Sequence, residues 1–113
     1  MSQITITDFK EYPIPGASGK IFKFIELFFP EQKVNDFALH MIIRRSNHHG
    51  YKYPKVIQYN GTYISDTNGS YIKFSDPLHA TFPDESLFIQ LSSADLLQTF
   101  SAVLSYEILG SWK

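Results

Sequence analysis

The chain contains 113 residues, of which 43% are hydrophobic, 16% aromatic and 19% charged, and it has no cysteine. This composition predicts one globular domain spanning residues 1–113 and excludes disulfides, thiolate metal ligands and cysteine nucleophiles. The formal net charge of -1 argues against a nucleic-acid partner, because such binding requires a strong positive field.

Neither a targeting segment nor a membrane span is expected. The first residues lack a basic region followed by an apolar run, so no signal peptide is predicted. The longest apolar stretch, residues 21–30, is interrupted by Lys23 and Glu26 and is too short to cross a bilayer. We therefore expect no membrane partner.

The first half of the chain shows short segments with the features of β-strands. Alternating, β-branched or aromatic side chains predict strands at residues 3–9, 21–29, 37–45 and 53–59. Residues 12–19 hold two prolines and two glycines and are expected to form a loop, because proline cannot donate to a β-ladder. The segment 21–29 is apolar on both faces, which is typical of a strand that is central in a sandwich or that covers a partner.

Two Asn-Gly pairs punctuate the middle of the chain. Asn60-Gly61 and Asn68-Gly69 lie between β-rich segments, and both residue types tolerate the positive φ of a type I′ hairpin turn. We expect each pair to close a hairpin. The result would be a three-stranded meander made of residues 56–59, 62–64 and 71–74.

The last third of the chain is less regular. Short strands are predicted at residues 79–82 and 86–91. From Ser93 onward the apolar side chains fit a helical stripe at first and then alternate as in a strand. The content of Thr, Val, Tyr and Ile favours one helical turn at most, at 94–97, followed by a long strand over 98–109.

These segments predict an all-β fold. About eight closely spaced strands with frequent turns suggest an antiparallel β-sandwich. A jelly roll fits best, because its two sheets bury both inner faces and leave few open edges. Other eight-stranded topologies remain open.

The residues that could support catalysis or metal binding form no recognisable pattern. The histidines are His40, His48, His49 and His79, whereas a zinc site needs three or four converging ligands. No Gly-x-Ser-x-Gly elbow, marked pair of carboxylates or phosphate-binding glycine loop is present in the sequence. We therefore expect no catalytic residue, metal ligand or cofactor, and we interpret the chain as a non-enzymatic protein.

A small basic and aromatic cluster lies around the end of the third predicted strand. It consists of Arg44, Arg45, Tyr51, Lys52 and Tyr53. Clusters of this kind can bind acidic surfaces or ligands, so these residues form a possible ligand-facing patch. The alternative is a solvated strand end, which the nearly neutral charge of the whole chain favours.

The architecture resembles that of the small jelly-roll virion proteins of tailed phages, such as capsid cement and decoration proteins. The resemblance is carried by the closing segment 100–110, Phe-Ser-Ala-Val-Leu-Ser-Tyr-Glu-Ile-Leu-Gly, and by the Asn-Gly meander before it. It implies a homo-oligomeric structural protein that docks on other virion proteins of a capsid or tail. Its location would be the virion, or the cytoplasm if it does not come from a phage. The residues expected at the interface are Phe22, Phe24, Phe28 and Trp112.

A second hypothesis is a carbohydrate-binding module or a receptor-binding fibre-tip domain, with a glycan as the partner. Tyrosine rings would then form a face on which sugars stack. The candidates are Tyr51, Tyr53, Tyr59, Tyr63 and Tyr71. A third class, a small enzyme of the cupin kind, would need metal ligands that converge inside the barrel, which the number and spacing of the histidines do not support.

Overall fold

The fold is all-β, which confirms the prediction of fold class. The computed structural model describes residues 2–34, 36–45, 53–59, 61–75 and 78–111, and within these ranges it contains ten strands and no helix. The strands are β1 (Ser2–Ile6), β2 (Tyr12–Pro13), β3 (Lys20–Pro30), β4 (Ala38–Arg45), β5 (Lys55–Tyr59), β6 (Thr62–Asp66), β7 (Gly69–Lys73), β8 (His79–Ala80), β9 (Glu85–Ser92) and β10 (Ala102–Ser111).

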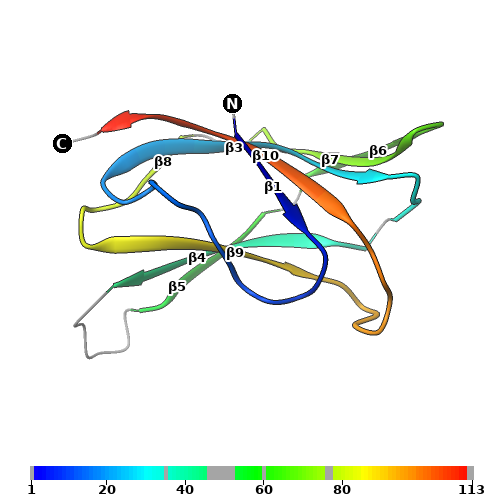
Figure 1. The fold of residues 1–113 in the computed structure, drawn as a ribbon, viewed down its shortest axis with the longest axis horizontal. Coiled ribbons are helices and arrows are strands. Elements are labelled where there is room, and N and C mark those ends of the chain that lie inside the picture. The colour runs from blue at the N-terminus through cyan, green and yellow to red at the C-terminus, as the bar shows by residue number, and fades with distance from the viewer. Residues whose placement is uncertain (1, 35, 46–52, 60, 76–77, 112–113) are drawn as a thin grey trace.

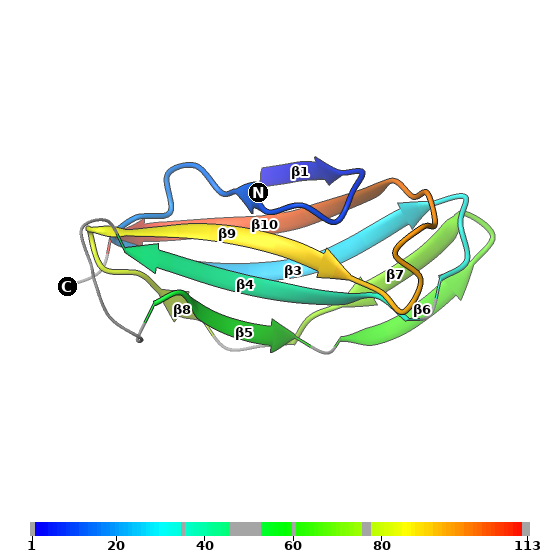
Figure 2. The same ribbon diagram turned by 90° about the horizontal axis from the view of Figure 1, so that it is seen from below.

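Two antiparallel sheets face each other and form a sandwich (Figure 1). Sheet A has the strand order β1-β10-β3-β7-β6, and β8 pairs with one end of β3. Sheet B has the strand order β2-β9-β4-β5. Figure 2 shows β9, β4 and β5 of sheet B side by side, with β5 at the border of the sheet.

The strands pair in a nested order. β1 pairs with β10, β2 with β9, β3 with β8 and β4 with β5. The first half of the described chain therefore folds back along the second half, and each sheet receives strands from both. The hairpin formed by β6 and β7 stands between β5 and β8 in the chain and extends sheet A beside β3.

Aliphatic and aromatic side chains from both sheets fill the space between them. The largest fully buried apolar side chains are Ile6, Phe22, Leu27, Phe29, Leu39, Met41, Ile72, Ile89, Leu91 and Leu104. At one end of the sandwich Phe9, Phe29, Phe37 and Phe100 pack together, with ring centroids 4.7 to 6.3 Å apart. Aromatic pairs at these separations stabilise a core beyond the effect of their buried area. The high aromatic content therefore serves the core.

A β-bulge explains why β3 is apolar on both faces. Ser105 of β10 pairs with Glu26 and Tyr106 pairs with Phe24, so Ile25 is an extra residue in β3. An extra residue moves the following side chains to the opposite face of the strand. The core therefore receives Phe22 and Phe24 before the bulge and Leu27 and Phe29 after it.

The bulge also corrects the predicted interface. Phe22 and Phe24 were expected on the surface, but both are buried between the sheets, so that part of the prediction is wrong. Phe28 lies on the outer face of sheet A, where it is half-buried and stacks on Tyr71 at 4.5 Å between ring centroids. Trp112 lies outside the described residues.

The predicted three-stranded meander is wrong at its first turn. β5 belongs to sheet B and β6 to sheet A, so Gly61 lies where the chain passes from one sheet to the other. A Cβ atom on Gly61 would lie 2.3 Å from the Cγ2 of Ile72 and 2.7 Å from the carbonyl oxygen of Lys73. The glycine thus permits close packing rather than a hairpin turn. Asn60 lies outside the described residues.

The second Asn-Gly pair does lie at a hairpin, between β6 and β7, but in another register. Asp66 pairs with Gly69, so the turn residues are Thr67 and Asn68, and the Asn68 N–H donates to Asp66 Oδ1 at 2.8 Å. Gly69 opens β7 with a φ of 139°, and a Cβ atom there would lie 2.1 Å from the carbonyl oxygen of Phe29. The glycine is needed for the close approach of β7 to β3.

Two predicted irregular segments also differ from the structure. The predicted loop 12–19 begins with the short strand β2, and Pro13 is tolerated there because β2 lies at an edge of sheet B. Residues 94–97 form no helical turn, which lies within the predicted limit of one turn, but β10 begins at Ala102 rather than at residue 98. The residues between β9 and β10 instead form a hydrogen-bonded loop, described below.

Candidate binding surface

The arginines of the predicted basic patch are both held by carboxylates. Arg44 donates from Nε and Nη2 to the two oxygens of Glu11, at 3.1 and 2.7 Å. Arg45 makes the same fork with Asp84, at 2.5 and 3.1 Å. These hydrogen bonds raise the pKa of Arg44 and the pKa of Arg45. The two positive charges are therefore neutralised within the fold.

Tyr53, the third described member of that patch, covers a buried carboxylate. Its hydroxyl donates to Glu85 Oε2 at 2.5 Å, the Phe82 N–H donates to Glu85 Oε1 at 2.7 Å, and Lys55 Nζ lies 3.4 Å from Oε2. Burial alone would raise the pKa of Glu85, but the hydrogen bonds from Tyr53 and Phe82 and the charge of Lys55 lower it on balance. This cluster serves the fold. Tyr51 and Lys52 lie outside the described residues.

The described tyrosines do not form one stacking face. Tyr59 is buried, and its hydroxyl bonds to His79 Nε2 at 2.5 Å. Tyr63 donates its hydroxyl to the carbonyl of Phe37 at 2.7 Å, and burial raises the pKa of Tyr63. Tyr71 of β7 stacks on Phe28 of the neighbouring strand β3. Since these rings lie in different surroundings, the predicted sugar platform is not assembled from them.

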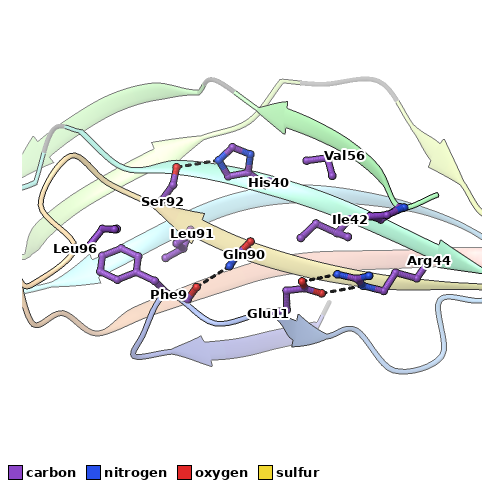
Figure 3. Close-up of a pocket in the computed structure, with 11 residues that line it drawn as sticks. Phe9, Glu11, His40, Ile42, Arg44, Val56, Gln90, Leu91, Ser92 and Leu96 are labelled. Atoms are coloured by element: carbon purple, nitrogen blue, oxygen red, sulfur yellow. Dashed lines mark hydrogen bonds and ion pairs between the residues drawn. The ribbon is translucent and has the colours of Figure 1, made fainter. Parts of the chain in front are cut away.

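A groove of about 420 Å³ lies on the outer face of sheet B (Figure 3). Its floor is Ile42, which points away from the core in the alternation of β4 and yet is buried. Phe9 and Leu96 lie toward one end, and Val56 lies toward the other. The groove is therefore mainly apolar, and it is lined by side chains of the strands, of the loop that follows β1 and of the loop between β9 and β10.

Polar side chains in the groove bond to one another or to the backbone. His40 Nε2 and Ser92 Oγ are 2.9 Å apart, and Gln90 Nε2 donates to the Phe9 carbonyl oxygen at 2.8 Å. The pair formed by Arg44 and Glu11 closes one side. These bonds fix the walls of the groove, so an apolar ligand could bind without first rearranging them.

Residues 93–101, between β9 and β10, form a loop beside the groove that carries two exposed leucines and is here named the leucine loop. Leu96, which also lines the groove, is 64% exposed, and Leu97 is 94% exposed. The loop is ordered by its polar residues: Ser93 Oγ donates to Asp36 Oδ2 at 2.8 Å, and the Leu97 N–H donates to Asp95 Oδ1 at 3.0 Å. Because these hydrogen bonds already order the loop, a molecule that contacted Leu97 would not have to meet the cost of ordering it.

The sequence analysis did not identify these residues. In the sequence, Leu96 and Leu97 fit a helical stripe and fall within the single helical turn allowed at 94–97. The signal that could have found them is the polar run around them, since Ser93, Asp95 and Gln98 favour local hydrogen bonds to the backbone over regular structure.

In the described portion of the chain, the groove shows neither a complete catalytic triad nor a cluster of metal ligands. His40 and Ser92 have the spacing of a base and a nucleophile, but among the described residues no carboxylate bonds to His40 to orient it. Within the same ranges, no three histidine, aspartate or glutamate side chains converge to hold a metal ion. His48 and His49 lie outside them.

None of the described residues forms a helix long and apolar enough to cross a membrane. Comparison of the chain with protein-family models, with curated proteins and with solved structures found no match.

Proposed function

We propose that this chain is a non-enzymatic interaction protein that docks on a protein partner through the outer face of sheet B. The docking face consists of the groove floored by Ile42 together with Leu96 and Leu97. The observation that carries the proposal is Leu97, a large apolar side chain almost fully exposed on an ordered loop. Exposing apolar surface of this kind next to an apolar groove is characteristic of interaction sites.

The charge around the docking face favours a protein over a lipid surface or a nucleic acid. Asp36 and Asp95 order the leucine loop, and both are acidic. Among the described residues that line the groove, the cation is Arg44, and it is already bonded to Glu11. Anionic lipids and phosphates would meet negative charge here, whereas an apolar protein surface would not.

We further propose that the partner is another virion protein and that the sandwich is a jelly roll. The nested pairs β1–β10, β2–β9, β3–β8 and β4–β5 support the jelly roll, since a long hairpin wound into two sheets pairs its strands in this order. The resemblance to capsid cement and decoration proteins supports the virion setting. On this reading the leucine loop anchors the protein on a capsid or tail.

Photocrosslinking tests the docking face. Leu97 is replaced by the photoreactive residue benzoylphenylalanine, and the same residue replaces Leu109, an exposed leucine on sheet A, as the control. We expect position 97 to give one discrete crosslinked protein and position 109 to give none. Equal crosslinking from both positions would contradict the proposal.

The crosslinked protein is then purified and titrated against single variants by calorimetry. Leu97→Asp should raise the dissociation constant by about tenfold or more, as expected for a central apolar anchor, whereas Leu109→Asp should leave it unchanged. For the virion setting, the chain should sediment with purified particles at fixed stoichiometry. A chain that stays at the top of the gradient would refute that part.

A further inference from the structure

The outer face of sheet A carries a row of apolar side chains that crosses four strands. Phe28 of β3 pairs with Val103 of β10 on one side and with Tyr71 of β7 on the other, and Tyr71 pairs in turn with Ile64 of β6. Directly opposed residues of neighbouring strands lie on one face, so the four form one row. Val103, Phe28 and Tyr71 are half-buried, and Ile64 is 43% exposed. In the described chain the two sheets are the only layers, so no strand packs on this row.

A pair of opposite charges lies beside the two rings. Glu26 pairs with Lys73 across β3 and β7, and Lys73 Nζ lies 3.5 Å from Glu26 Oε1. Each of these residues stands two positions from a ring on its own strand, so it points to the same outer face. The centre of the face is therefore a square, with Phe28 and Glu26 on β3 and with Tyr71 and Lys73 on β7.

We propose that this outer face packs on the same face of a second copy of the chain, about a two-fold axis that runs parallel to the strands, midway between β3 and β7. The axis places β3 of one copy over β7 of the other. Phe28 then faces Tyr71 of the second copy, and Val103 faces Ile64 of the second copy. Sheets packed face to face lie about 10 Å apart with nearly aligned strands, which lets such side chains interdigitate.

A second copy suits this face because both of its patterns are self-complementary. The apolar row runs aliphatic, aromatic, aromatic, aliphatic, so it reads the same in both directions. The axis also places Glu26 over Lys73 of the second copy and Lys73 over Glu26, so unlike charges face each other at both positions. Self-complementarity is what a two-fold interface requires, since the same patch is used on both subunits. Any other partner would have to repeat both patterns.

The proposed contact has a defined end, where the ladder between β3 and β7 stops at Glu26 and Lys73. A second ion pair of sheet A, formed by Lys23 of β3 and Glu107 of β10 at 3.9 Å, lies beyond that end. Leu109 lies further still, six positions from Val103 along β10. Six positions of a strand span about 20 Å. The ion pair and Leu109 are therefore outside the contact and serve as controls.

The dimer goes beyond the docking face of sheet B and does not rest on it. Because the two copies meet through sheet A, their two grooves would lie on opposite outer sides, and the dimer would bridge two partners. Leu97→Asp should weaken docking and leave dimerisation unchanged, whereas variants of Glu26 or Lys73 should do the reverse. The failure of one proposal is thus distinguishable from the failure of the other.

Exchange of the two charges tests the packing by sedimentation equilibrium. Glu26→Lys alone and Lys73→Glu alone set like charges opposite each other across the axis, so each should weaken dimerisation at least about tenfold. In an equimolar mixture of the two variants unlike charges face each other again at every position. The mixture should therefore form heterodimers about as tightly as the unaltered chain forms dimers. A mixture no more dimeric than its components would overturn the proposal.

Lys23→Glu and Glu107→Lys are the matched control for general attraction between charges. They alter an ion pair of the same sheet that lies outside the contact. Each variant alone should dimerise like the unaltered chain, and mixing them should change nothing. If this pair responded as strongly as Glu26 and Lys73, the attraction would not depend on the proposed axis, and the proposal would be wrong.

The apolar row is tested without changing either ion pair. Ile64→Lys should weaken dimerisation at least about tenfold, because Ile64 faces Val103 of the second copy. Leu109→Lys is the control, since Leu109 is 44% exposed and lies outside the contact. Circular dichroism checks that each variant is folded, and where one is not, the remaining pairs of variants decide. Equal effects at positions 64 and 109, or an unaltered chain that stays monomeric up to about 1 mM, would refute the packing.

Discussion

Among the carboxylates of the ion pairs, Glu85 should contribute most to stability, so Glu85→Ala should lower the free energy of unfolding more than removal of any of the others. The Glu85 side chain is only 2% exposed and receives hydrogen bonds from the Tyr53 hydroxyl and the Phe82 N–H, with the Lys55 ammonium 3.4 Å away. Hydrogen bonds to a charged group contribute roughly 1.5–3 kcal/mol each, and part of this offsets the cost of burying the carboxylate. We therefore expect a loss of about 3 kcal/mol in the free energy of unfolding.

Urea denaturation at neutral pH measures this loss directly. In a thermal melt the same change should lower the Tm by about 12 °C for a domain of this size. The control is Glu107→Ala, which breaks an exposed 3.9 Å contact with Lys23 and should cost under about 0.5 kcal/mol. If Glu85→Ala cost no more than Glu107→Ala, the view of Glu85 as an anchor would be refuted.

The pH dependence of the protein's stability follows from the lowered pKa of Glu85. The pKa of Glu85 is lower in the folded state than in the unfolded chain, where a glutamate titrates at about 4.3. Its contribution is therefore fully present above that value and is lost as the pH falls through the folded pKa. Glu85→Gln removes this titration, so its stability deficit should shrink on acidification below about pH 4. A deficit that stays constant between neutral pH and that range would contradict the assignment.

Three further substitutions test other features, each by urea denaturation. Phe22→Ala should lower the free energy of unfolding by about 3–5 kcal/mol because it leaves a cavity in the core, whereas Phe28→Ala, on the outer face, should lower it clearly less. If Phe28→Ala were the more destabilising, the position of the bulge in β3 would be wrong. Gly69→Ala should cost more than about 1 kcal/mol, because the new methyl group would meet the Phe29 carbonyl oxygen, and an unchanged midpoint would show that β7 can move away. Arg44→Ala should cost only about 0–1 kcal/mol, since its fork with Glu11 is exposed, and a larger loss would mean that the fork holds the N-terminal loop in place.

Most strands were predictable because the alternation of side chains reports directly on the two faces of a sheet. Residues 37–45 show this well, since Leu39, Met41 and Ile43 face the core as their spacing indicates. Where the ladder is irregular, the same reasoning fails. A bulge at Ile25 reverses the faces of β3, and no local feature of an all-apolar segment shows where an extra residue will stand.

Contacts between residues that are distant in the sequence could not be predicted either. Asn60-Gly61 has the composition of a hairpin turn, but Gly61 packs against Ile72 of sheet A, whereas the preceding strand β5 belongs to sheet B. The basic patch failed for the same reason, since Arg44 and Arg45 are paired with Glu11 and Asp84, more than thirty positions away. Pairings of this kind are fixed by topology, and topology is what local patterns determine least.

The candidate site was the least predictable part. A groove needs several strands in register, and its floor, Ile42, looks in the sequence like any outward residue of an alternating strand. Val56 and Leu96 come to the same groove from opposite halves of the chain. Only the exposed leucines carried a local signal, in the polar residues that order their loop.

The nested pairing sets the order in which the protein can assemble as it is made. β10 stands between β1 and β3 in sheet A, so β1 has no neighbour in its ladder until residues 102–106 have left the ribosome. The hairpin of β6 and β7 can close earlier, because its strands are adjacent in the chain. Contacts between distant residues form slowly, and unpaired apolar strands aggregate while they wait. Yield during synthesis should therefore depend on how quickly β10 reaches its place.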